Sequence, residues 1–201
     1  MGFLTETKDN TTIWIGNMKF IVFPAFDVVL DIQSLCKEDL PGTMKIQHAL
    51  EMLVVNRWKL SFLDMRKKEE LLREIYKKCI ITNQNRRGHQ QSSVFDLEYD
   101  GEYIYSSFML DYGMDLFEMR GRLHWKKFIA LFKGLSEKTK MREVMRIRTM
   151  EIPQYNGKNG KQIQDIQELK SYYGLQVSGG GGQEGLDGLF SALERMAVKD
   201  G

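Results

Sequence analysis

The chain has 201 residues, of which 42% are hydrophobic, and a formal net charge of +2 at pH 7. This length fits one domain, or one domain with an appendage, with enough apolar residues for a buried core. The small net charge excludes a protein whose overall field alone would recruit nucleic acid or an anionic membrane. The longest apolar runs fall far short of the ~20 residues that span a bilayer, and the N-terminus lacks the order of a signal peptide. We therefore expect a soluble, intracellular protein.

The first predicted element is a β-hairpin over residues 11–23. Ile13 and Ile15 alternate with more polar or larger neighbours, which is the two-residue period of a half-buried strand. Gly16-Asn17 supplies a two-residue turn before a second β-rich run. Because two strands alone are marginally stable, the hairpin is expected to pack on helices.

Helical periodicity dominates the rest of the chain, so the predicted fold class is mainly α, with a compact helical domain over residues 1–177. The predicted helices cover about residues 25–38, 43–55, 60–81, 98–112, 123–133, 137–149 and 161–173. Thr43 is expected to cap the helix over 43–55, and Gly113 is expected to end the helix over 98–112. The polar stretch Asn83–Ser93 is predicted to be a loop between two halves.

The C-terminal part is predicted to be a separate element. Residues 178–182 contain four glycines and are predicted to be a flexible linker, followed by an amphipathic helix over residues 183–201. The apolar residues of this helix have the spacing that helix-in-groove recognition uses, so we take them as candidate partner-binding residues. They are Leu186, Leu189, Phe190, Leu193 and Met196. Docking of this helix on the chain's own core is an equally favoured alternative.

Charge is distributed unevenly over the stretch Val94–Arg148. Residues 94–118 contain seven acids and no Lys or Arg, whereas residues 120–148 contain ten bases and two acids. Both parts are dense with aromatic and aliphatic residues at helical spacing. We predict a helical hairpin whose halves attract each other, which indicates a packing or interaction protein before it indicates an enzyme.

No pattern typical of a catalytic or metal site is found. The three histidines are isolated from one another and from the cysteines: His48, His89 and His124. His124 is therefore interpreted as a partly buried hydrogen-bonding residue, and Cys36 and Cys79 as buried reduced thiols. The segment Gly157–Lys161 lacks the spacing of a phosphate-binding loop and is interpreted as a turn. We predict no catalytic residues, no metal site and no cofactor.

Two carboxylate pairs have the i,i+4 spacing that places both groups on one helix face: Asp96/Asp100 and Asp111/Asp115. They could bind a divalent ion, and a hydrolase that uses Asp96 and Asp100 is one hypothesis for the chain. A solvated helix face, or a salt-bridge partner for the basic half, is the favoured interpretation.

Several short strings, in their order along the chain, resemble a family of small tailed-phage proteins. They are YIYSSF at 103–108, DYGMDL at 111–116, LHWKKF at 123–128, Gly134-Leu135, RIR at 146–148 and LKSYY at 169–173. The resemblance covers roughly Phe3 to Leu175. It places the family-motif core at Tyr105, Phe108, Tyr112, Gly113, Leu123, His124, Trp125 and Phe128. Such proteins are generally encoded just upstream of the tape-measure gene in long-tailed phages and prophages of Gram-positive bacteria.

The resemblance implies a non-catalytic tail-assembly chaperone that binds the tape-measure protein during assembly of a long non-contractile tail. The tail-tube protein and a second copy of the chain are further candidate partners. The protein would act in the cytoplasm of the bacterial host and be absent from the mature virion. One departure is Lys126, which stands where a second aromatic residue is expected after Trp125. Twelve methionines would suit adaptable apolar contacts, and Met196 is the best placed of them for a partner.

The alternative hypothesis is a basic helical nucleic-acid-binding protein of a phage or mobile element. Bases of the second half could line such a surface with Trp125 among them. They are Lys126, Lys127, Lys133, Lys138, Lys140, Arg142, Arg146 and Arg148. The acidic segment just before them would neutralise much of their field, which favours the chaperone hypothesis.

A deletion tests the two alternatives for the C-terminal helix. If this helix is a partner-binding arm, removing residues 179–201 leaves the melting temperature within about 2 °C and weakens binding to the tape-measure protein. Differential scanning calorimetry and a pull-down measure the two effects. A large loss of stability would show instead that the helix is part of the core.

Overall fold

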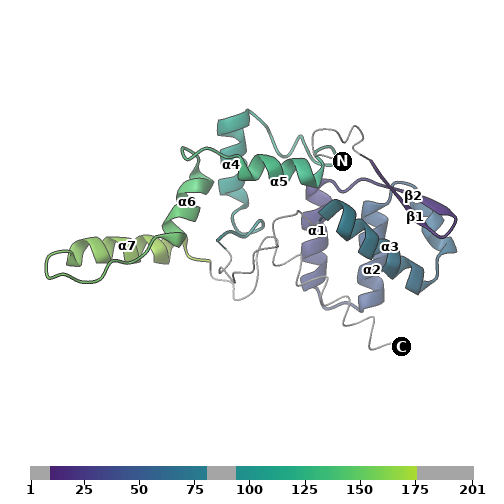
Figure 1. Ribbon diagram of the computed structural model, residues 1–201, viewed down its shortest axis with the longest axis horizontal. Helices are drawn as coiled ribbons and strands as arrows, with labels where there is room; N and C mark the ends of the chain where they lie inside the picture. The colour runs from purple at the N-terminus through teal and green to yellow at the C-terminus, as the bar shows by residue number, and fades with distance from the viewer. Residues whose placement is uncertain (1–9, 81–93, 176–201) are drawn as a thin grey trace. The chain divides into compact units, whose positions relative to one another are not determined.

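The computed structural model describes residues 10–80 and 94–175 (Figure 1). The fold is mainly helical with an N-terminal β-hairpin, which confirms the predicted class. The hairpin consists of β1 (Thr11–Ile15) and β2 (Met18–Val22). The helices are α1 (Phe26–Lys37), α2 (Gly42–Leu53), the 3₁₀ helix η2 (Arg57–Phe62), α3 (Met65–Ile75), the π-helical turn η3 (Tyr76–Ile80), α4 (Gly101–Tyr112), α5 (Trp125–Lys133), α6 (Lys140–Thr149) and α7 (Gly160–Tyr173). The predicted loop at 83–93, the glycine linker at 178–182 and the helix at 183–201 lie outside the described residues.

The described residues form two compact units. Residues 10–80 and 119–131 make up the first unit, and residues 94–118 and 132–175 make up the second. The sequence patterns predicted one helical domain over residues 1–177, with the loop at 83–93 between two halves. They did not predict that residues 119–131 belong to the first unit. Most of α5 belongs to the first unit, and its last two residues belong to the second.

The hairpin of the first unit has one buried face. Ile13 and Phe20 pair across the strands and are both fully buried, as the alternation predicted. Gly16 adopts a φ of +56°, a conformation that glycine reaches at no steric cost. The hairpin packs on α3, which also contacts α2, so helices cover the apolar face that two strands cannot bury alone (Figure 1).

Two predictions about helix ends in this unit were wrong. The helix predicted over residues 60–81 is interrupted at Leu63 and Asp64, because the Asp64 carboxylate accepts a hydrogen bond from the Lys67 N–H (2.8 Å) and caps a new helix there. Thr43 does not cap α2. The helix begins one residue earlier, with Pro41 at its N-cap and no side-chain capping bond.

In the second unit, α4 packs antiparallel to α6, and α7 packs on α6. Three contacts define the antiparallel pairing, with Asp111 against Ser136, Ser107 against Met141, and Asp100 against Arg148. These contacts agree with the predicted hairpin, since α4 comes from the acidic part of the chain (94–118) and α6 lies almost entirely in the basic part (120–148). Helix α4 begins at Gly101, three residues later than predicted.

Gly113 ends α4 in the left-handed conformation, as predicted, with φ +58°. Its N–H donates to the Met109 carbonyl oxygen (3.0 Å), which satisfies an otherwise unpaired carbonyl at the helix end.

Replacing Gly113 by alanine is expected to lower the free energy of unfolding by about 1–2 kcal/mol, because the left-handed region is strained for a residue with a Cβ. Gly101→Ala is the matched control. This glycine opens the same helix, has no positive φ and has open space around its Cβ position, so the substitution should not destabilise the protein. Urea unfolding measures both effects, and equal stability of the two variants would contradict the prediction.

Candidate functional site

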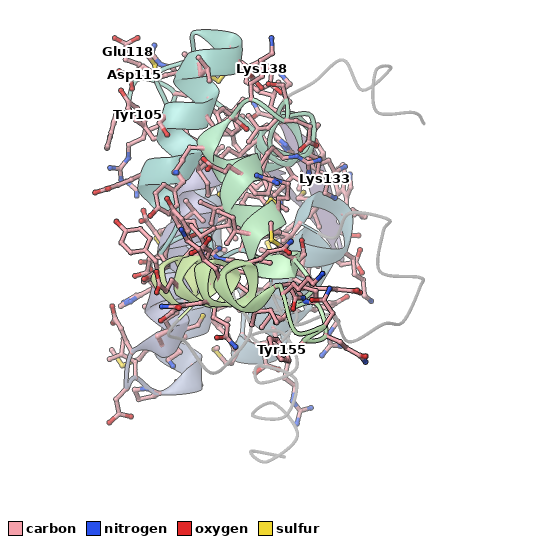
Figure 2. The ribbon with its side chains drawn as sticks, turned by 90° about the vertical axis from the view of Figure 1, so that its left-hand side faces the viewer. Tyr105, Asp115, Glu118, Lys133, Lys138 and Tyr155 are labelled. Carbon is pink, nitrogen blue, oxygen red and sulfur yellow. The ribbon has the colours of Figure 1, made fainter. Side chains whose placement is uncertain are left out.

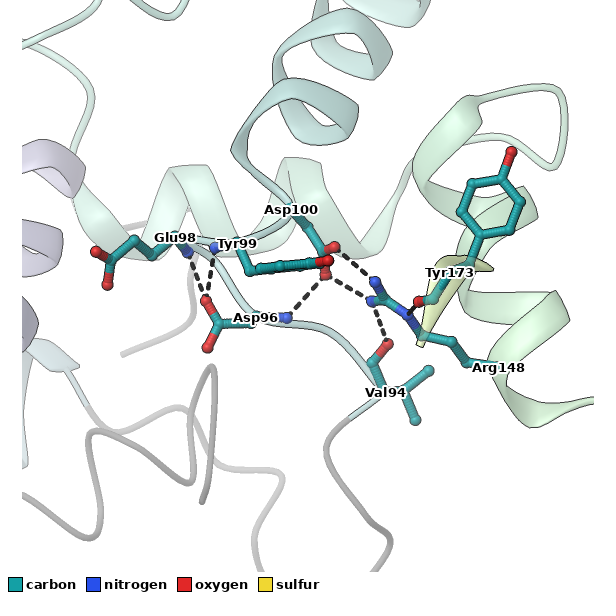
Figure 3. Close-up of polar contacts among 7 residues, drawn as sticks. All are labelled: Val94, Asp96, Glu98, Tyr99, Asp100, Arg148 and Tyr173. Carbon is teal, nitrogen blue, oxygen red and sulfur yellow. Dashed lines mark hydrogen bonds and ion pairs between the residues drawn. The ribbon is translucent and has the colours of Figure 1, made fainter. Parts of the chain in front are cut away.

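The most buried charged group of the second unit is an ion pair between Arg148 of α6 and Asp100, the residue before α4 (Figure 3). The arginine side chain is 7% exposed and the carboxylate is fully buried. Nη1 donates to Oδ2 (2.6 Å) and Nη2 donates to Oδ1 (2.7 Å), so the pair is bidentate.

Further bonds use the remaining capacity of both groups. Arg148 Nε donates to the Tyr173 carbonyl oxygen (2.6 Å), and Nη1 donates to the Val94 carbonyl oxygen (3.0 Å). Oδ2 of Asp100 also accepts the N–H of Asp96 (2.9 Å). The cluster thus joins α4, α6, the end of α7 and the segment at Val94 before α4. Its groups are paired and buried, which identifies it as structural (Figure 3).

The carboxylate pairs do not form the sites that their spacing suggested. Asp96 lies in a turn before α4, where Oδ1 accepts the N–H groups of Glu98 (2.9 Å) and Tyr99 (2.8 Å). Asp96 and Asp100 are both buried, so the solvated-face interpretation is wrong for them, and the salt-bridge interpretation is confirmed for Asp100. Within residues 10–80 and 94–175, no group of three His, Cys, Asp or Glu side chains could hold a metal ion.

Asp111 has a specific partner. As an anion in the last turn of α4 it opposes the helix dipole, which makes its position unfavourable in isolation. In the structure its carboxylate accepts the backbone N–H of Ser136 (2.6 Å) and the Ser136 hydroxyl (2.8 Å). The charge therefore anchors the turn that leads into α6.

The histidine and cysteines take mainly structural positions. His124 is 7% exposed, and its Nδ1 accepts the N–H of Lys126 (3.2 Å), as predicted. Cys79 is buried, whereas Cys36 is only partly buried, and neither of these cysteines forms a disulfide in the described part of the chain. Loss of hydration raises the pKa of Cys36 to about 11, so this thiol is protonated and weakly nucleophilic at neutral pH.

The family-motif core is divided between the two units. Leu123, His124, Trp125 and Phe128 are buried in the first unit, where the Trp125 Nε1–H donates to the Ile80 carbonyl oxygen (3.3 Å). In the second unit, Phe108 is fully buried, Tyr105 is partly buried, and Tyr112 and Gly113 are exposed. Most of these motif residues therefore specify packing within each unit.

Residues of the proposed nucleic-acid surface are also used within the structure. Trp125 is fully buried and cannot stack on a base. Three of the bases pair with carboxylates: Lys140 with Glu143, Arg142 with Glu137, and Arg148 with Asp100. Both observations weigh against the alternative hypothesis.

The first unit exposes an aromatic surface that the sequence patterns did not identify. We call Trp14, Trp58 and Phe62 the aromatic row, and their exposed fractions are 60%, 65% and 66%. The rings of Trp58 and Phe62 lie edge to face with centroids 6.2 Å apart. Phe62 falls within the helix predicted over residues 60–81, and the break at Asp64 places it instead at the end of η2. Trp14 could have been found from its strand position, since Ile13 and Ile15 take the buried face.

Polar contacts hold the segment that carries Trp58 and Phe62 beside the hairpin that carries Trp14. The Val55 N–H donates to the Ile21 carbonyl oxygen (2.8 Å). The Asn56 side chain accepts the Ile21 N–H (2.9 Å) and donates to the Lys19 carbonyl oxygen (3.0 Å). These bonds fix η2 along the outer edge of β2.

A second exposed aromatic group lies in the second unit (Figure 2). The Tyr105 hydroxyl donates to Asp115 Oδ2 (3.4 Å), and its ring centroid lies 5.2 Å from that of Phe117, which is 69% exposed. Loss of hydration raises the pKa of Tyr105, and the charges of Asp115 and Glu118 raise it further, so the phenol remains a donor. This surface is acidic, in contrast to the surroundings of the aromatic row.

A family model described as "Bacteriophage Gp15 protein" matches residues 9–175. Among curated proteins and among solved structures, none matches the chain. The tentative partner-binding residues Leu186, Leu189, Phe190, Leu193 and Met196 lie beyond this match and outside the described residues. None of the described helices is both long and apolar enough to cross a membrane.

Replacing Asp100 by asparagine is expected to lower the free energy of unfolding by about 3–5 kcal/mol, because it leaves the Arg148 charge buried without a counter-charge. Glu137→Gln is the control, since it removes the carboxylate of a solvent-exposed pair with Arg142 and should cost less than about 0.5 kcal/mol. Chemical denaturation measures both. Similar losses in the two variants would show that the buried pair is not a main support of this unit.

Proposed function

The chain belongs to the bacteriophage Gp15 protein family, and we propose that it is a non-catalytic tail-assembly chaperone. In this role it binds the tape-measure protein while a long non-contractile tail is assembled. It acts in the cytoplasm of the host and is absent from the mature virion. The motif strings that resemble such chaperones all fall within the residues that the family model matches.

The observation that carries the proposal is the exposed aromatic row of the first unit. Trp14, Trp58 and Phe62 project from a hairpin and a helix that are fixed by hydrogen bonds and by a buried core. Aromatic residues are enriched at the energetic centres of protein interfaces. Because these side chains stand on ordered backbone, a partner can bind them at a small cost in conformational entropy.

The groups that could perform chemistry have structural partners, which is consistent with a binding role. Asp96 caps a turn, and Asp100 pairs with Arg148. His124 accepts a backbone N–H, and the Cys36 thiol is protonated at neutral pH. A protein that binds a partner and later releases it needs an exposed binding surface such as the aromatic row, and it needs no reactive group.

Co-expression with the product of the adjacent tape-measure gene tests the proposal. We expect the tape-measure protein to aggregate when it is expressed alone and to become soluble, in a complex that co-purifies with this chain, when both are expressed. Expression with an unrelated helical protein of similar size is the control. The proposal is wrong if the tape-measure protein stays insoluble and no complex is recovered.

A further inference from the structure

We propose that the aromatic row is the docking surface for an amphipathic helix of the tape-measure protein whose apolar stripe is flanked by Asp and Glu. This inference rests on the proposed function and deepens it. It names the surface, the secondary structure of the partner segment and the charge of its flanks.

The first step is that the row spans two elements held in register. Trp14 pairs with Lys19 across the hairpin, so both side chains stand on the face opposite the buried Ile13 and Phe20. The Lys19 carbonyl oxygen accepts bonds from the side chains of Asn56 (3.0 Å) and Lys59 (3.2 Å). Lys19 of β2 thus pairs with Trp14 of β1 on one side and binds the segment at η2, which carries Trp58 and Phe62, on the other.

The second step is the charge around the row. Lys19, Arg57 and Lys59 border it, and within the described part of the chain none of the three pairs with a carboxylate. Lys59 Nζ lies 5.4 Å from the centroid of the Trp58 ring, so its positive charge makes a cation–π contact with that ring. Basic residues around an apolar centre select a partner with acids beside its own apolar residues.

The third step is the shape of the partner. The Trp58 and Phe62 ring centroids are 6.2 Å apart, and apolar side chains at i and i+4 on a partner helix have Cβ atoms roughly 5–6 Å apart, so such a pair can cover both rings. Val55, which is 59% exposed, adds aliphatic surface beside them. An amphipathic helix presents such a stripe of apolar anchors with polar flanks on both sides.

A nucleic acid fits this surface less well. Specific nucleic-acid interfaces are strongly basic, and nucleic-acid-binding proteins often neutralise several phosphates with Lys and Arg. Here three cations border the row, and Lys59 is engaged with the Trp58 ring and the Lys19 carbonyl oxygen.

The experiment compares variants of the full chain in complex with the tape-measure protein. Trp58→Ala and Phe62→Ala are each expected to weaken binding at least about tenfold in a titration, because they remove exposed aromatic anchors. Lys59→Glu keeps both rings and is expected to weaken binding as well, by placing an acid against the acidic flanks of the partner. Tyr155→Ala is the matched control, because this side chain is 71% exposed and lies in the second unit (Figure 2). Thermal unfolding of each variant should match that of the unaltered chain.

Each outcome decides a separate point. If the unaltered chain does not bind the tape-measure protein, the proposed function fails and this inference fails with it. If the unaltered chain binds and the row variants bind equally well, the inference alone is wrong. The inference is also wrong if the row variants lose only self-association in light scattering, or only binding to a single-stranded DNA probe with a steep dependence on salt.

Discussion

The second unit depends on a buried arginine–aspartate pair. Removing two charges from water is costly, and Arg148 and Asp100 offset that cost only through bidentate geometry and additional bonds to both groups. Because those bonds reach α4, α6, the end of α7 and the segment at Val94, the pair fixes four pieces of chain at one point. A hydrophobic contact of the same size would hold them together without defining which groups must meet.

Other polar contacts of the unit follow the same antiparallel line between α4 and α6. The Ser107 hydroxyl accepts the Met141 N–H (3.0 Å), an early backbone donor of α6 that has no partner within its own helix. Asp111, in the last turn of α4, accepts the N–H and the hydroxyl of Ser136, which lies just before α6. On the side of α6 that α7 covers, Lys170 Nζ donates to the carbonyl oxygens of Arg148 and Met150 (both 2.7 Å). The apolar core supplies the contact area, and these bonds determine the register.

Much of the secondary structure could be predicted because it depends on local patterns. Alternation of Ile13 and Ile15 marked the hairpin, and Gly113 marked the end of α4. Long-range pairing could not be read in this way. Nothing local shows that Arg148 and not another of the ten bases meets Asp100, 48 residues away. The exposure of Phe62 could not be predicted for a related reason, because the Asp64 cap ends one helical register and starts another.

The division between buried and exposed aromatic residues bears on how the motif should be interpreted. Trp125, Phe128 and Phe108 are buried, so their presence in the family strings follows from packing within each unit. Trp14, Trp58 and Phe62 have no such packing role, yet they remain exposed on ordered backbone. Exposed aromatic groups of this size are costly in solubility unless something covers them for part of the protein's lifetime. The strings that identify the family therefore account for the fold, and the partner-binding function is better sought among exposed residues outside those strings.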